Sequence, residues 1–205
     1  MRTRSTLQSG SSILEFAIVI PLFTLMLYGV FTTGMSISKA QQVSTLTREA
    51  GTMFLRFVDF SIPGNQALLI RQASGLGLTS GGGNGVIVLS AFKMIGEGDC
   101  IAGGLEPRNC PNFGYPVVVK RHLIGNKDLF KSTFGAPEAA FFEENGTIPA
   151  SKYLTDTGCR AEKLEALVAL AAGESAYLSE GFFRTPELDI PGYQRDSTIY
   201  QRAIF

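Results

Sequence analysis

Two residues near the N-terminus, a glycine and a glutamate, could take part in proteolytic processing and in charge pairing. Gly10 stands directly before a long apolar run, and Glu15 lies inside the start of that run. A residue as small as Gly10 lets the backbone enter a protease as an extended chain, and cleavage after it would make Ser11 the new N-terminus. An ionisable group at membrane depth costs about 2.5 to 3.5 kcal/mol at the bilayer centre. We therefore expect Glu15 to have a partner or a task.

The element that positions these residues is a membrane segment. Residues 16–38 contain no charged side chain, and Arg2 and Arg4 precede them without any acidic residue among the first ten positions. A helix rises ~1.5 Å per residue, so this stretch spans roughly 34 Å, enough to cross a hydrocarbon core of about 30 Å. The N-terminal arginines place a short leader, residues 1–10, in the cytoplasm and the rest of the chain outside.

Three kinds of N-terminal segment compete for this pattern. A secretory signal peptide does not fit, because the uncharged run is too long and begins at a glutamate. A plain signal anchor fits the length and the flanks but gives no reason for Glu15. This alternative stays open, and it would make the protein an envelope protein whose exported head binds a surface ligand without joining a filament.

The third possibility explains the glutamate. Gly10, four further residues, and then Glu15 followed by the aromatic Phe16 resemble the type IV prepilin pattern. The resemblance implies that a prepilin peptidase cuts between Gly10 and Ser11. Glu15 would then pair with the freed α-amino group of a neighbouring subunit, because an unpaired charge away from water is expensive. That pairing would set the register of one subunit on the next, with Phe16 beside it.

Residues 13–29 narrow the resemblance further. The pair Glu15 and Phe16, the apolar run and Pro21 are similar to the opening of TadE-like proteins, the minor pilins or pseudopilins of tight-adherence (Tad/Flp) pili. Residues 48–51 continue the similarity less specifically. The resemblance implies a bacterial inner-membrane protein with an exported head that later joins an extracellular pilus. It implies as partners a prepilin peptidase, other pilin subunits and, before assembly, the inner membrane; the length of the chain favours a minor subunit.

Proline in the middle of this helix has its own consequence. Pro21 removes one backbone donor and crowds the carbonyl of Ala17, so we expect a kink near there.

Composition and the remaining reactive residues exclude several function classes. With 18 basic and 18 acidic residues, the chain has no overall field to attract nucleic acid. His122 is the only histidine, no nucleophile accompanies it, and an ordinary surface or packed histidine is the expectation. Glu143 and Glu144 are expected on a solvated face. We therefore expect no enzyme activity, no cofactor and no metal site.

Cysteines provide a covalent constraint. Cys100, Cys110 and Cys159 lie on the exported side, where disulfides persist. Cys100 and Cys110 are the favoured pair, because the short loop between them is rich in glycine and proline and has little apolar content to hold it. Cys159 is then left over. The alternative is three reduced, partly buried thiols.

The fold class expected from these patterns is α+β, pilin-like: a long N-terminal helix packed on a small antiparallel sheet. The helix covers residues 11–60, membrane-spanning to about residue 38 and then amphipathic, and the exported head covers residues 61–205. The amphipathic stripe comprises Val43, Leu46, Ala50, Met53, Phe54 and Phe57. Strands are predicted at residues 86–92, 115–124 and 174–183, a short helix at 66–74 and a glycine-rich turn at 80–85. Residues 161–172 are ambiguous, and their apolar spacing favours a helix. The apolar tail could dock on the sheet or on a neighbouring subunit.

Overall fold

The computed structural model describes the backbone of residues 9–186 and 197–205, and side chains from Ile13 onwards. Most of the expected leader therefore lies outside the described residues. The chain divides into two compact units, Met1–Ala40 and Gln41–Phe205, which are considered separately. The long helix α1, Ser9–Leu55, contributes its N-terminal part to the first unit and its C-terminal part to the second.

The C-terminal end of α1 departs from the predicted stripe. Phe57 was expected on the buried face, but the helix ends at Leu55 and the Phe57 side chain is 83% exposed. The chain closes the helix with a Schellman arrangement, in which Val58 N–H donates to Met53 O and Phe57 N–H donates to Phe54 O. This arrangement places Phe57 in the left-handed region, with φ 62°. The turn that stops the helix thus swings Phe57 away from the core.

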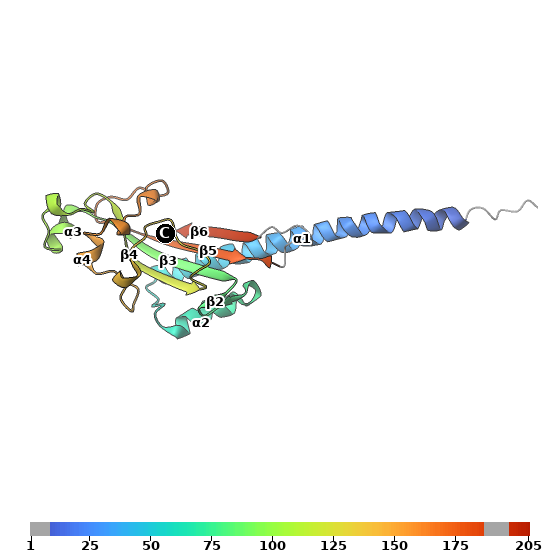
Figure 1. The fold of residues 1–205 in the computed structure, drawn as a ribbon, viewed down its shortest axis with the longest axis horizontal. Helices are drawn as coiled ribbons and strands as arrows, with labels where there is room; N and C mark the ends of the chain where they lie inside the picture. The colour runs from blue at the N-terminus through green and yellow to red at the C-terminus, as the bar shows by residue number, and fades with distance from the viewer. Residues whose placement is uncertain (1–8, 187–196) are drawn as a thin grey trace, which may run out of the picture. The chain divides into compact units, whose positions relative to one another are not determined.

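A four-stranded antiparallel sheet forms the centre of the head (Figure 1). Its strand order is β4-β3-β5-β6, with β3 at Gly85–Met94, β4 at Pro116–Gly125, β5 at Ser175–Arg184 and β6 at Thr198–Ile204. The α+β prediction is confirmed, and β3, β4 and β5 coincide closely with the predicted strands. The tail docks on the sheet as β6, an element that was not predicted as a strand.

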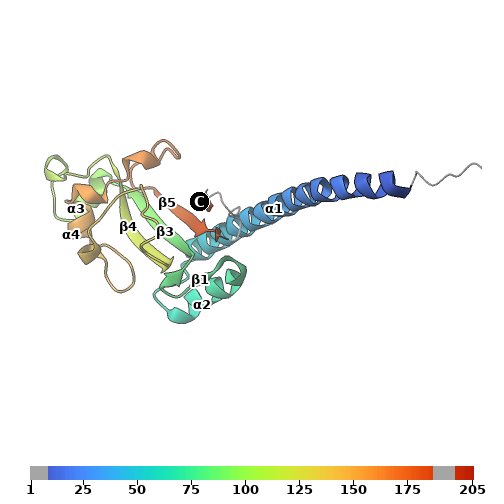
Figure 2. The same cartoon turned by 45° about the vertical axis from the view of Figure 1, so that its right-hand side comes forward.

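Short elements connect the strands. Figure 2 shows α2 and β1 near one end of the sheet and α3 and α4 near the other. The glycine run forms a hairpin, in which β1 (Leu78–Thr79) pairs with β2 (Gly82–Gly83). The helices are α2 at Pro63–Gln72, α3 at Glu97–Ala102 and α4 at Ala150–Tyr153. Single 3-10 turns occur at Ser74–Leu76, Pro107–Asn109, Ala139–Phe141, Thr157–Cys159 and Glu162–Leu164.

Apolar side chains pack in two clusters. In the first, the C-terminal part of α1, residues 41–55 and here called its outer part, packs on the side chains of β3 and β5 that face it. The members of this cluster include Val43, Leu46, Ala50, Phe54, Leu69, Ile87, Leu89 and Phe183. In the second, loops and short helices gather around the other end of the sheet; its members include Phe92, Ile95, Val118, Phe134, Leu154, Leu164 and Leu178. A fully buried leucine contributes roughly 1.5 to 3 kcal/mol, so the α1 stripe is a main stabilising element of the head.

The helix predicted at residues 161–172 is wrong. Only the 3-10 turn Glu162–Leu164 forms there. Backbone bonds to the sheet hold both ends of the segment: Ala161 N–H donates to Pro116 O, and Gly173 N–H donates to Met94 O. The apolar residues of this segment are spaced as in a helix because several of them face the second cluster. Leu164 is buried in that cluster, and Leu167 and Val168 pack against it from irregular backbone.

Candidate assembly site

The predicted assembly residues lie together at the start of α1. Gly10 and Ser11 belong to its first turns, Glu15 and Phe16 follow, and Pro21 is inside the helix. Large apolar side chains of this segment are exposed; they include Ile13, Leu14, Phe16, Ile18, Leu22, Leu25, Met26, Val30 and Phe31. Among the described residues, α1 is the one helix long and apolar enough to cross a membrane, and its most apolar window has no buried residue. The roles assigned to the five residues stay predictions.

Small residues bring the outer part of α1 close to the sheet. A Cβ atom added to Gly181 on β5 would lie 2.3 Å from Thr47 Oγ1, and one added to Gly51 would lie 3.0 Å from Ser179 Cβ. The Phe205 ring also covers Gly51. Thr47 is 1% exposed, and its hydroxyl donates to Val43 O at 2.7 Å. The helix is therefore seated on β5 at a distance that larger side chains would not allow.

His122 lies under the end of α1. Its ring meets Phe54 and Phe60 edge-on, with centroid separations of 5.9 and 6.3 Å. Burial, and after it the charge of Lys120, lowers the pKa of His122 to about 4, and the charge of Asp59 opposes this shift. The imidazole is thus neutral and packed at pH 7, in agreement with the expectation of a packed histidine.

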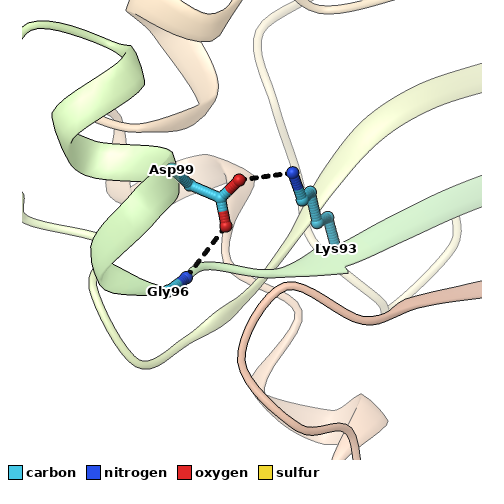
Figure 3. Close-up of polar contacts among 3 residues, drawn as sticks. All are labelled: Lys93, Gly96 and Asp99. Atoms are coloured by element: carbon cyan, nitrogen blue, oxygen red, sulfur yellow. Dashed lines mark hydrogen bonds and ion pairs between the residues drawn. The ribbon is translucent and has the colours of Figure 1, made fainter.

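Helix α3 is held against the end of β3 by an ion pair between Asp99 and Lys93 (Figure 3). The Asp99 carboxylate accepts from Lys93 Nζ and, at 3.0 Å, from Gly96 N–H. Burial alone would raise the pKa of Asp99, but these two hydrogen bonds and the charge of Lys93 together lower it. Asp99 therefore caps α3 in its ionised form and positions the loop that follows.

A disulfide closes that loop from α3 to Cys110. Cys100 and Cys110 are joined, with a Cα–Cα distance of 6.0 Å, and Cys159 is a free, buried thiol. Burial raises the pKa of Cys159 to about 11, so this thiol is neutral and unreactive at pH 7.

Removing the disulfide should destabilise the head. For a closed loop of this length, the loss of chain constraint in the unfolded state predicts about 2.5 kcal/mol for Cys100→Ser with Cys110→Ser. The unfolding midpoint in urea, with and without reductant, measures this effect. Cys159→Ala is the matched control, since it should leave the response of the head to reductant unchanged. Equal stability of the oxidised and reduced protein would contradict the expectation.

Two charged residues on the other face of the sheet were not singled out from the sequence. Arg121 is held by Ser90 Oγ at 2.8 Å and by the carbonyls of Phe134 and Gly135 at 2.6 and 3.1 Å. Burial lowers the pKa of Arg121 to about 10, against the charges of Glu180 and Cys159, which raise it. Glu180 is fully buried and accepts from Tyr200 Oη at 2.8 Å. These contacts fix the loop after β4 and strand β6, and they are structural.

The described residues offer no metal site. Among residues 13–186 and 197–205, no group of three or more histidine, cysteine, aspartate or glutamate side chains is arranged to hold an ion. Glu143 and Glu144 are exposed.

An exposed apolar N-terminal helix, whose outer part packs on an antiparallel sheet, defines a membrane-anchored protein of pilin-like α+β architecture. Residues 10–52 match the family model described as TadE-like protein. The recognition of a TadE-like, minor-pilin-like protein is thereby confirmed, and it associates the chain with the Tad pilus. The match ends within α1, so residues 53–205 lie outside it. No curated protein sequence matches the chain, and no solved structure does.

Proposed function

We propose that this protein is a structural subunit or assembly factor of a tight-adherence type IV pilus, processed after Gly10 and assembled through its apolar N-terminal helix. The observation that carries the proposal is that the TadE-like match covers an exposed apolar helix with Glu15 near its start. An uncovered apolar helix is stable only in lipid or against other helices. Before assembly the membrane supplies the lipid, and after assembly the core of the filament supplies the other helices.

Processing and assembly would be coupled through charge. Cleavage between Gly10 and Ser11 by a prepilin peptidase frees an α-amino group at Ser11. This cation would meet Glu15 of the neighbouring subunit, where the low dielectric makes an unpaired carboxylate costly. The pair fixes the axial register, and Phe16 packs beside it. The head, which the outer part of α1 carries, then faces the exterior, and the protein acts as a structural component rather than as an enzyme.

Glu15→Ala tests the proposal. We expect incorporation into pili to fall by about tenfold or more, since the register contact is lost, while the protein still enters the membrane. Glu49→Gln is the matched control, because Glu49 is an exposed acid of the same helix outside the uncharged run. The measurement is immunoblotting of sheared pili against the membrane fraction.

The same strains decide between the two candidate functions. N-terminal sequencing of the membrane-extracted protein should begin at Ser11. Unchanged assembly of Glu15→Ala, together with an intact Met1, would instead favour the signal-anchored envelope protein whose head binds a surface ligand.

A further inference from the structure

The outer edge of β4 is only partly covered by the chain itself. Arg121 N–H donates to Gly146 O and Ile148 N–H donates to Val119 O, both at 2.8 Å, so residues 146–148 run antiparallel beside β4. The chain enters this edge through a tight turn, in which Gly146 N–H donates to Glu143 O. The short ladder along β4 therefore stops at Arg121.

Beyond Arg121 the edge of β4 is open. Backbone groups of an antiparallel strand alternate between its two neighbours, and the bond from Arg121 N–H shows that odd-numbered residues here point outward. Leu123 N–H and C=O therefore face away from β3, and neither has a hydrogen-bond partner in the part of the chain that the structure describes. Unpaired strand edges of this kind are templates for another strand.

A cavity of about 720 Å³ lies along this open edge. Phe60 lines it on the side of α1 and Phe130 on the opposite face of the sheet, and Phe142 is a third aromatic residue of the lining. His122, which also lines it, has a buried Nε2 atom without a hydrogen-bond partner in the described chain. The volume falls in the range of about 300 to 1,000 Å³ that is typical of ligand sites. The lining mixes apolar and polar side chains, and the three phenylalanines offer contacts for apolar side chains of an extended segment.

Charged residues distinguish the two ends of the cavity. Lys127 and Lys131 follow the C-terminal end of β4, whereas Glu143 and Glu144 lie beside the turn that leads into the ladder near Lys120. A segment lying antiparallel to β4 has its N-terminal end near the two lysines. Charge complementarity therefore favours an acidic residue at the N-terminal end of the segment and a basic residue at its C-terminal end.

We propose that this groove binds an extended peptide segment of a partner protein, which continues the ladder on β4 at Leu123. The segment has the pattern acidic, apolar, any, apolar, basic, and its main chain pairs with the β4 edge while its apolar side chains fill the cavity. Strand addition of this kind takes affinity from main-chain hydrogen bonds and specificity from pockets for alternate side chains. The site is separate from the helix that drives the proposed assembly, so each can fail without the other.

Short synthetic peptides test the site on the full chain in lipid nanodiscs. The probe is fluorescently labelled Glu-Val-Thr-Val-Lys with blocked ends, and its charge-swapped control is Lys-Val-Thr-Val-Glu. Fluorescence anisotropy should show saturable binding of the first peptide and binding of the second that is weaker by about tenfold. Two N-methylated forms, at adjacent positions, identify the ladder: one should lose about tenfold in affinity and the other should not, because the amides of adjacent residues point to opposite sides and only one set points at β4.

Protein variants check the direction of the segment. Lys127→Glu and Lys131→Glu, combined with Glu143→Lys and Glu144→Lys, change only exposed side chains and should reverse the preference between the two peptides. Leu123→Pro, which removes the outward amide, should abolish binding. Absence of saturable binding, equal loss from both N-methylated forms, or an unreversed preference would each overturn the proposal.

Discussion

Gly181→Val should destabilise the head by about 3 kcal/mol. Gly181 lies on β5 where α1 crosses the sheet, and even a Cβ atom there would approach Thr47 Oγ1 to 2.3 Å. Thr47 cannot move aside easily, because it is buried and bonded to its own helix. Overpacking of this kind costs about 1 to 3 kcal/mol, and lifting α1 also weakens the apolar contacts of Val43, Leu46 and Phe54.

Pulse proteolysis in urea, on the full chain in detergent, measures this loss. Gly98→Val is the matched control: Gly98 lies in α3, a Cβ atom there would meet nothing within 4 Å, and valine is the better helix former. The double variant Thr47→Ala with Gly181→Val should be more stable, by about 1 kcal/mol or more, than the sum of the two single losses in unfolding free energy predicts. Additive effects, or a Gly181→Val protein as stable as the unaltered one, would show that α1 does not rest on β5 at this point.

The helix and three strands could be predicted because their signals are local. Apolar spacing after residue 40 repeats with the helical period, and the segments that become β3, β4 and β5 are rich in β-branched and aromatic residues. Strand β6 was missed because Gln201 and Arg202 interrupt its apolar pattern, and its pairing with β5 is made across residues 185–197. Likewise, the Schellman turn that exposes Phe57 involves a non-glycine residue that the sequence does not mark.

The contacts of the candidate sites were visible only in part. Gly10, Ser11 and Glu15 form a contiguous motif, so sequence alone could propose their roles. The approach of Gly51 and Gly181 to their neighbours joins segments far apart in the chain, and no single-sequence pattern pairs them. The open edge at Leu123 depends on where the turn at residues 143–146 brings the chain onto β4. Each of these features follows from long-range packing, which propensity and periodicity do not encode.

Acidification should weaken the head through His122. The pKa of this side chain falls from an ordinary 6.5 to about 4 in the folded protein, chiefly because burial disfavours the charged form. Between these two values the unfolded chain binds a proton that the folded chain does not, so the free energy of unfolding decreases as the pH falls. The stabilising effect is complete above pH 6.5, and about 2 to 3 kcal/mol of it is lost by pH 4.

Hydrogen exchange of the β3 and β4 amides, corrected for intrinsic rates, follows this loss from pH 7 to pH 4. His122→Gln is the test variant, because glutamine is polar but does not titrate; its protection should change far less over this range. Asp99→Asn is the matched control. Ionised Asp99 stabilises the fold above the ordinary carboxyl pKa of 3.8, and that contribution is lost only as the pH falls below this value. The control should therefore retain the loss between pH 6.5 and 4. If His122→Gln lost as much hydrogen-exchange protection as the unaltered protein, another group would cause the loss of stability. The burial of neutral His122 under Phe54 would then not make the packing of α1 depend on pH.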